Sequence, residues 1–374
     1  MGPTRTFALR AGRVVLIAVS VVLVALLPVL GVLLLWSRGT PAPFLDADGK
    51  PLPGSISEKI HVPINGVEQG MVIKGKNVAN PVLLYLHGGM PDYFLTRDYP
   101  TGLDEYFTVV WWDQRGSGLS FSADIPTETM TPDQLVSDTI AVTDYLRKRF
   151  GRDKIYLMGH SGGTFIGIQT AARAPERYDA YIAIAQMTDQ LQSERLAYDY
   201  MLKRFREDGD EQMVRSLEAA PVTDEIPLPD AYISVRDVAM HKLGIGTTHD
   251  MKSIVTGLML RSFQFREFTL GEKIDLWRGK IFSGRLLWNQ ELTTDLTKKV
   301  TLLEIPVYFV HGAYDYTVSY PLAKSYYEQL DAPLKGFYTF SQSAHSPLFE
   351  EPTRMREIIQ ADVLTGSNRL ADPE

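Results

Sequence analysis

The chain has 374 residues, of which 45% are apolar, so it is long enough to bury a full hydrophobic core. Its net charge of −7, without a stripe rich in lysine and arginine, argues against a nucleic-acid partner. The absence of cysteine excludes thiol nucleophiles, disulfides and thiolate metal sites, and no two of the seven histidines have the short spacing of a zinc-binding helix, so we predict no metal.

The N-terminal region contains an uninterrupted uncharged run at Val14–Trp36. A helix of this length, at ~1.5 Å per residue, spans a hydrocarbon layer of ~30 Å, and the run is longer than the apolar core of a cleaved signal peptide. We therefore predict a single transmembrane anchor at residues 14–36. Several arginines precede the run and only Arg38 stands close behind it, which predicts a cytoplasmic tail at residues 1–13 and an extracytoplasmic catalytic part.

Residues 37–58 are rich in proline, glycine and aspartate, which predicts a semi-extended linker. Residues 59–374 have the pattern of one α/β domain, in which short apolar runs alternate with helical patterns. Continuous apolar runs are typical of parallel strands buried on both faces of a sheet. The runs are Val82–Leu86, Thr108–Trp112, Ile155–Met158, Tyr181–Ala185, Val307–Val310 and Gly336–Phe340.

The clearest helical pattern begins after Thr131, which can cap a helix. Pro132 suits the first turn and Gln134 occupies the capping-box position. We expect this helix to run to about Phe150 and to end at Gly151. Strands that alternate with helices of this length predict right-handed crossovers and a mostly parallel, doubly wound sheet.

The alternation is interrupted between about residues 187 and 300. This stretch is rich in helix formers and charged residues and has no convincing buried strand, and the strand pattern resumes only at Ile305. We predict that it forms a helical lid inserted into the sheet order, not a separate domain.

A nucleophile motif follows the predicted strand Ile155–Met158. The run Gly159-His160-Ser161-Gly162-Gly163 has the G-x-S-x-G spacing, and a helical pattern comes after it. A sharp strand-to-helix turn needs small neighbours so that a strained serine can project its hydroxyl, and the helix N-terminus favours developing negative charge. We predict Ser161 as the nucleophile.

An acyl-transfer nucleophile also needs backbone donors for the oxyanion. They are usually the N–H after the serine and a second N–H from a loop behind an earlier strand. His87-Gly88-Gly89 follows the strand Val82–Leu86 and fits the second role. We predict Gly162 and Gly89 as the donors; the alternative is that the loop glycines only make a tight turn.

The general base should be a histidine in a loop beyond the last strands, and the acid should follow an earlier strand end. His345 lies after the strand Gly336–Phe340, and Asp315 lies after the strand Val307–Val310. We predict His345 as the base and Asp315 as the carboxylate that orients it. Asp189, which follows another predicted strand, is the rival for the acid.

With these motifs the sequence resembles the proline iminopeptidase-like branch of the α/β-hydrolases, over about residues 59–362. The resemblance rests on the following positions: His87-Gly88-Gly89, Asp113-Gln114-Arg115-Gly116-Ser117-Gly118, the Ser161 elbow, Asp315 and His345. It implies an α/β-hydrolase fold, a mostly parallel sheet with an inserted lid, and a serine hydrolase that requires no cofactor. Asp113 and Arg115 would need partners if buried, so we predict a structural role for both.

The sequence departs from the family pattern in several places. Met90-Pro91-Asp92 follows Gly89 where the family continues with Pro-Gly, Gly162 replaces an aromatic residue after the nucleophile, and a membrane anchor is not part of the common pattern. Aminopeptidases of this branch hold the substrate amine with lid carboxylates, and the sequence does not select one. The candidates are Glu194, Glu207, Glu211, Glu218, Glu267 and Glu272.

Together these residues predict a membrane-anchored serine hydrolase that works by two-step acyl transfer. Its substrate is expected to be a small molecule or a short peptide, cleaved by an aminopeptidase of the proline iminopeptidase type or, alternatively, by a carboxylesterase or lactonase. A third interpretation is a non-catalytic binding protein on a hydrolase fold. The lipid bilayer is the other predicted partner, and the sequence gives no oligomeric state.

Overall fold

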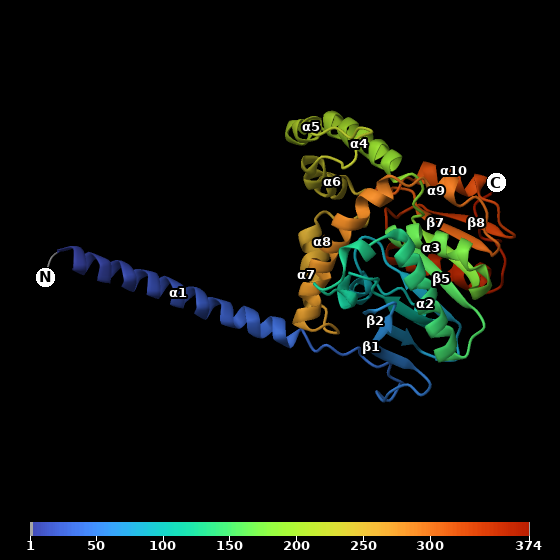
Figure 1. Ribbon diagram of the computed structural model, residues 1–374, viewed down its shortest axis with the longest axis horizontal. Coiled ribbons are helices and arrows are strands. Elements are labelled where there is room, and N and C mark those ends of the chain that lie inside the picture. Colours follow the sequence, from blue (N-terminus) through green and yellow to red (C-terminus); the bar gives the residue numbers. More distant parts are fainter. Residues whose placement is uncertain (1–2, 374) are drawn as a thin grey trace.

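The structure is a computed structural model that describes the backbone of residues 3–373. Within this range the side chains of residues 3–12, 14, 15, 18, 22 and 23 are outside the description. The first helix, α1 (Pro3–Leu35), extends away from the rest of the protein, and the chain then passes along the lid helices before it enters the sheet (Figure 1).

The predicted membrane anchor at residues 14–36 coincides with most of α1, which contains Pro28. Among the residues that the structure describes, no helix is long and apolar enough to cross a membrane. The structure therefore does not support the predicted anchor. Some side chains of residues 14–36 are outside the description. The cytoplasmic tail at residues 1–13 falls almost wholly on such side chains and stays a prediction.

An eight-stranded sheet forms the centre of the protein, in the order β1-β2-β4-β3-β5-β6-β7-β8. The hairpin of β1 and β2 pairs antiparallel with β4, and the neighbours from β4 to β8 are all parallel. The mostly parallel sheet confirms the predicted architecture. The strands are β1 (Ile56–Ile64), β2 (Val67–Gly75), β3 (Val82–Leu86), β4 (Thr108–Trp112), β5 (Ile155–His160), β6 (Tyr178–Ile184), β7 (Val307–Gly312) and β8 (Lys335–Phe340).

The six predicted strands correspond to β3–β8, whereas the hairpin of β1 and β2 was not predicted. Its turn is Asn65-Gly66, and both residues have positive φ, 46° and 80°. Asn-Gly is the favoured sequence for such a turn, so this dipeptide was the available signal. Because β1 begins at Ile56, it overlaps the end of the linker predicted at residues 37–58.

Helices cover both faces of the sheet, as β3 illustrates. Leu84 and Leu86 pack in the core cluster that includes residues of α2 and α3, whereas Leu83 and Tyr85 pack in the cluster on the opposite face. Alternate side chains of one strand therefore reach two cores, which explains the continuous apolar run. The covering helices include α2 (Pro132–Phe150), α3 (Gly162–Arg173), α10 (Tyr320–Gln329), α11 (Pro347–Glu350) and α12 (Pro352–Ile358).

Helix α2 confirms the predicted bounds and caps. The Thr131 side chain accepts a hydrogen bond from Gln134 N at 3.2 Å, and Gly151 ends the helix in the left-handed conformation. The capping box is incomplete, because the Gln134 side chain donates to Asp138 at 2.8 Å. The local sequence therefore set the ends of this helix, and the Gln134 side chain bonds to Asp138, one turn further along the same helix.

Between β6 and β7 the chain forms the helices of the lid, residues 187–300. Helices α4–α6 share a hydrophobic cluster of their own and lie beyond one end of the sheet, and α8 runs from them towards the start of the chain's globular part (Figure 1). The lid helices are α4 (Gln190–Glu207), α5 (Glu211–Glu218), α6 (Asp230–Leu243), α7 (Leu260–Gln264), α8 (Leu270–Leu292) and α9 (Leu296–Lys299). Short 3-10 or π-helical segments are η1 (Tyr93–Arg97), η2 (Leu103–Glu105), η3 (Gly118–Ser120), η4 (Thr127–Thr129), η5 (Pro175–Arg177), η6 (Val255–Met259) and η7 (Ile359–Val363).

Asp113 and Arg115 lie in the buried loop after β4, where both have structural partners. Asp113 accepts a hydrogen bond from Leu119 N at 2.7 Å. Arg115 makes a two-pronged contact with Asp138 of α2, at 2.6 and 3.1 Å, and neither side chain is more than 1% exposed. This ion pair ties the loop and α2 together.

We expect Arg115→Met to lower the free energy of unfolding by about 3–5 kcal/mol, because it leaves the buried Asp138 carboxylate without its cation. Urea unfolding measures this change. The matched control is Arg173→Met, which removes an exposed pair with Asp133 and should change the free energy by less than about 1 kcal/mol. Equal effects of the two substitutions would contradict a structural role for Arg115.

Candidate active site

Ser161 stands at the sharp turn between β5 and α3. Its φ of 56° and ψ of −125° lie in a region that residues other than glycine rarely adopt, at a cost of about 1–3 kcal/mol. The Ser161 N–H donates to the carbonyl of Ile184 at 3.0 Å, which fixes the turn to the neighbouring strand β6. The serine is therefore held in the strained conformation of a nucleophile elbow.

Glycines surround the elbow because neighbouring backbone leaves no room for a side chain. A Cβ atom on Gly163 would lie 2.1 Å from the Leu86 carbonyl oxygen, and one on Gly159 would lie 2.7 Å from the Gly163 oxygen. A Cβ on Gly88 would lie 2.7 Å from Ser161 Cβ. The spacing of small residues in the motif thus reflects close contact between β5, α3 and the loop after β3.

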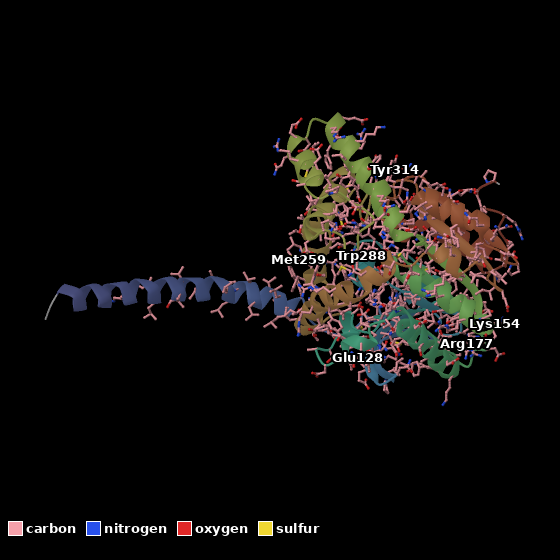
Figure 2. All side chains as sticks on the ribbon, turned by 45° about the horizontal axis from the view of Figure 1, so that its top comes forward. Glu128, Lys154, Arg177, Met259, Trp288 and Tyr314 are labelled. Carbon is pink, nitrogen blue, oxygen red and sulfur yellow. The ribbon has the colours of Figure 1, made fainter. Side chains whose placement is uncertain are left out.

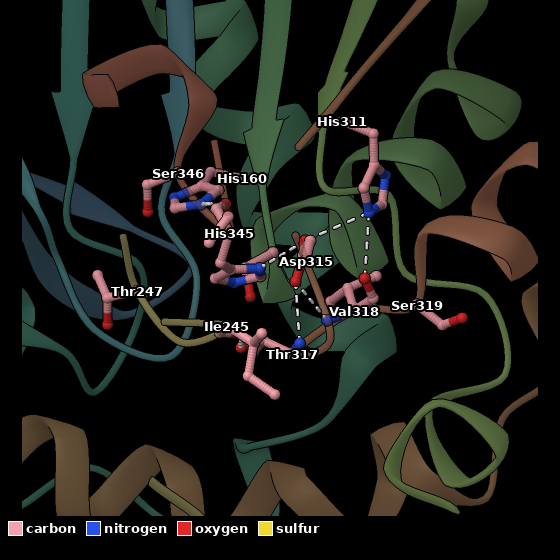
Figure 3. A network of polar contacts seen from close by, with 12 residues as sticks. His160, Ile245, Thr247, His311, Asp315, Thr317, Val318, Ser319, His345 and Ser346 are labelled. Atoms are coloured by element: carbon pink, nitrogen blue, oxygen red, sulfur yellow. Dashed lines mark hydrogen bonds and ion pairs between the residues drawn. The ribbon is translucent and has the colours of Figure 1, made fainter. Parts of the chain in front are cut away.

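Asp315 and His345 meet at the ends of β7 and β8, as Figure 3 shows. His345 Nδ1 is 2.9 Å from Asp315 Oδ2, and the other carboxylate oxygen accepts the N–H groups of Thr317 and Val318 at 2.9 and 3.0 Å. His311 Nε2 also lies 3.2 Å from Asp315 Oδ2. The carboxylate is thus fixed from several sides and can orient the imidazole of His345.

The charges at this pair suit a neutral base and an ionised acid. Burial lowers the pKa of His345 below its ordinary value, although the Asp315 carboxylate opposes the shift. Burial alone would raise the pKa of Asp315, but His345 and His311 outweigh it and hold that pKa well below its usual range. His345 is therefore unprotonated near neutral pH, as a general base must be.

Ser161 and His345 line the same cavity, which has a volume of about 600 Å³. Within the described chain no hydrogen bond joins Ser161 Oγ to His345 Nε2, although the first chemical step requires one. Such contacts are often long in a free enzyme and tighten when substrate binds. Asp315 lies behind His345 and does not line the cavity.

The predicted oxyanion donors, Gly89 and Gly162, also line the cavity. Among the described residues neither backbone N–H has an acceptor, so both can donate to a ligand. Gly88 is the loop glycine that packs against Ser161. A Cβ on Gly89 would have no other atom within 4 Å. The loop glycines thus have separate roles, one in packing and one in exposing an N–H group.

Asp189, the rival acid, serves a different purpose. Its side chain accepts a hydrogen bond from Gln192 N at 3.0 Å and caps the start of α4.

In the described part of the chain no group of three or more histidine, aspartate or glutamate side chains is arranged to hold a metal ion.

The lid carboxylates considered from the sequence do not line the cavity, and each has a partner elsewhere. Glu194 is buried and accepts both prongs of Arg236, each at 2.6 Å. Glu267 accepts a hydrogen bond from the Tyr93 hydroxyl at 2.5 Å, and Glu272 forms an ion pair with Lys59 at 2.7 Å. The remaining three lie in surface pairs with arginines: Glu207, Glu211 and Glu218.

Glu291, at the end of α8, is the cavity carboxylate that sequence reasoning missed. Its Oε1 atom lies 3.5 Å from the position that a Cβ on Gly162 would take, next to the nucleophile. It has no hydrogen-bond or ion-pair partner among the described residues, and burial raises its pKa to about 7. No sequence pattern marked this residue, because its place depends on how α8 packs against η3 and the other lid helices. Trp288, one turn earlier on α8 and labelled in Figure 2, lines the same cavity.

The sheet order, the elbow and the inserted helices define an α/β-hydrolase. A family model described as "Serine aminopeptidase, S33" matches residues 102–232. The probable aminopeptidase YbaC of Bacillus subtilis (strain 168) is 32% identical over 305 residues, which are 80% of this chain and 94% of that protein. The chain therefore belongs to the serine aminopeptidase-like family of the α/β-hydrolases, and it is a hydrolase.

Solved structures agree on the fold. A proline iminopeptidase from Mycobacterium smegmatis matches with a TM-score of 0.57 and 16% identity, over 81% of this chain and 97% of its own. A proline iminopeptidase-related protein from Thermus thermophilus matches with a TM-score of 0.51 and 22% identity, over 82% and 98%. At these identities the likeness concerns the fold alone.

We expect a fluorophosphonate probe to label wild-type protein at Ser161 and to leave Ser161→Ala unlabelled, because the strained serine and neutral His345 together make a reactive hydroxyl. Mass spectrometry of the labelled peptide measures this. Asp315→Asn should slow labelling by about 10³–10⁴-fold, since the imidazole loses its orienting partner.

The control for labelling is Ser346→Ala, which removes another serine that lines the same cavity. This variant should be labelled like wild type. Labelling that survives in Ser161→Ala would contradict the assignment of the nucleophile.

Proposed function

We propose that the protein is a serine aminopeptidase that cleaves an N-terminal residue, of the proline iminopeptidase type, from a short peptide or aminoacyl amide. The observation that carries the proposal is the unpaired Glu291 carboxylate beside Ser161. A substrate with a free amine supplies the cation that this carboxylate lacks. The name of the 32% identical relative, a probable aminopeptidase, agrees with it.

The electrostatics of the cavity favour a cationic group at Glu291. Glu291 is half-buried, and desolvation of its carboxylate raises its pKa to about 7, so the ionised form is less favourable there than in water. An ammonium group bound there would restore the ionised form and gain a charge-assisted hydrogen bond. Among the other carboxylates of the cavity lining, Asp92 and Asp237 contact His160 and Arg236, whereas Asp230 is exposed at the start of α6.

The proposed mechanism is two-step acyl transfer. His345 takes the proton of Ser161 as the hydroxyl attacks the carbonyl carbon, and the Gly89 and Gly162 N–H groups hold the oxyanion. His345 then gives the proton to the leaving amine. A water molecule, deprotonated by the same histidine, releases the acyl group and restores Ser161.

The rest of the cavity suits an apolar side chain of the substrate. Its lining includes aromatic and aliphatic residues from the sheet domain and from the lid: Phe165, Ile166, Met187, Leu228, Ile233 and Met240. An apolar acyl pocket also suits a simple ester, and the experiment below separates the two substrate classes.

We expect the full-length protein to hydrolyse prolyl or other aminoacyl arylamides and to lose this activity when the substrate amine is acylated. Glu291→Gln should raise KM for the amide about 10- to 100-fold, because it removes a buried charge-assisted contact. For the wild type, kcat/KM should fall as the pH drops through about 7, since protonation neutralises Glu291.

Short p-nitrophenyl esters serve as the internal control, because they have no amine and should be indifferent to Glu291→Gln. Glu218→Gln, a lid carboxylate outside the cavity, is the matched variant. Turnover of esters alone, unaffected by any lid carboxylate, would make the protein a carboxylesterase or lactonase and overturn the aminopeptidase proposal.

We further propose that α1 holds the protein at a membrane with the catalytic part on the extracytoplasmic side. The proposal rests on the uncharged sequence of residues 14–36 and on the arginines before it. Apart from the half-buried Leu33, the large apolar side chains described along this helix are exposed, from 41% at Val32 to 74% at Leu35. Such a surface is unfavourable in water and suits a lipid environment.

We expect the full-length protein to remain in the membrane pellet after alkaline carbonate extraction, and the double substitution L26K and L27K to release it. Each lysine near the centre of a bilayer costs about 2.5–3.5 kcal/mol. The control is Leu302→Lys, at an exposed leucine of the globular part. Wild-type protein that stays in the supernatant would contradict the anchor.

A further inference from the structure

A second carboxylate–imidazole pair lies next to His345, and both of its residues line the cavity. His160, the residue before the nucleophile, has its Nδ1 atom 3.1 Å from Asp92 Oδ2. Asp92 lies in the run Met90-Pro91-Asp92, where the oxyanion loop departs from the family pattern. Tyr85 donates its hydroxyl hydrogen to the same carboxylate oxygen at 2.6 Å. The exposed fractions are only 7% for His160 and for Asp92 and 1% for Tyr85.

The other nitrogen of His160 contacts the loop that carries the base. His160 Nε2 lies 2.9 Å from the backbone carbonyl oxygen of His345, and the two rings are 5.0 Å apart. The catalytic-base loop, residues 343–347, is held on its N–H side by Glu350, which accepts from Ala344 and Ser346 at 3.0 and 3.1 Å. His160 thus bonds a backbone carbonyl of the catalytic-base loop, while Glu350 bonds two of its backbone N–H groups.

The partners of His160 determine its protonation. A carbonyl oxygen can only accept a hydrogen bond, and an ionised carboxylate can only accept as well. His160 satisfies both partners only if both ring nitrogens carry hydrogen, which makes it an imidazolium. The hydroxyl of Tyr85, which donates to Asp92, stabilises the carboxylate form. Burial opposes the charge, but the contact with Asp92 outweighs burial and raises the pKa of His160.

A cation at His160 acts on the catalytic base, because the like charge disfavours a second proton on His345. The other ionisable groups around the two histidines are Asp315 and His311 beside His345, and His87, Asp92 and Tyr85 beside His160. Glu350, which bonds the amides on either side of His345, is a further one, and burial raises its pKa to about 7. Burial lowers the pKa of His87 to about 4, so that ring is neutral. Asp315 favours protonation of His345, and His160 opposes it.

We propose that Asp92 and His160 are positioning residues, which fix the catalytic-base loop through the His345 carbonyl and keep His345 unprotonated to lower pH than Asp315 alone would allow. This inference rests on the proposed hydrolytic mechanism. It gives a chemical reason for the aspartate in the loop Met90-Pro91-Asp92, since an uncharged side chain at position 92 could not stabilise an imidazolium at His160.

The test is the pH dependence of fluorophosphonate labelling, which reads the nucleophile and its base for any substrate class. In Asp92→Asn the amide can donate to His160 Nδ1, so the imidazole becomes neutral while its contact with His345 remains. In His160→Gln the amide can still donate to the His345 carbonyl without charge. In both variants we expect the acid limb of the labelling rate to move to higher pH.

His160→Ala removes the contact as well as the charge. We expect its maximal labelling rate to fall about tenfold or more below those of Asp92→Asn and His160→Gln, because a buried carbonyl loses its donor. The control is His61→Gln on the exposed face of β1, which should leave both the limb and the rate unchanged. Thermal unfolding of each variant establishes that it is folded.

An acid limb that stays in place in folded Asp92→Asn and His160→Gln would overturn the proposal and leave the pair as a packing contact. Equal maximal rates in His160→Ala and His160→Gln would overturn the positioning part. If wild-type protein is not labelled at all, the hydrolytic mechanism fails and this inference with it. Labelling without aminoacyl-amide turnover would reject the aminopeptidase alone.

Discussion

The strained turn at Ser161 is the constraint on which the rest of the site depends. A serine with positive φ is unfavourable by itself, and it persists because β5, α3 and the loop after β3 leave no other path for the backbone. The close approach of Gly163 to Leu86 and of Gly88 to Ser161 brings the oxyanion loop to the nucleophile. One local conformation therefore positions the hydroxyl, the helix N-terminus and the two free N–H groups together.

His345, the proposed base, is held by contacts that come from distant parts of the chain. Asp315 fixes the ring of His345, His160 contacts its carbonyl, and the lid contributes a carbonyl at Gly246 that accepts the His345 N–H at 3.3 Å. The same region of the lid reaches Glu350 through the N–H of His249, at 2.6 Å. A movement of the lid would therefore change the setting of the base as well as access to the cavity.

Charge pairing in the lid distinguishes structural from functional carboxylates. Glu194 lies deep in the lid but is neutralised by Arg236, and its remaining acceptor capacity is used by Tyr232 and Gln190. Glu291 is closer to the nucleophile and has no such partners among the described residues. A cavity-lining carboxylate that the protein does not satisfy is a better candidate for substrate binding than one that it does.

The sequence by itself determined the features that depend on neighbouring residues. The apolar runs of β3–β8, the caps of α2 and the small residues around Ser161 could be predicted because their physical causes act within a few positions. The hairpin of β1 and β2 carried an Asn-Gly signal, although β1 is half-exposed and polar residues and glycines limit the apolar run of β2 to Met71–Ile73. Only the tertiary structure decided that Asp189 caps a helix while Asp315 meets His345, because both follow a strand end. It also decided the roles of Glu291 and His160, since burial and partners from distant segments, not local pattern, set the charge of a side chain.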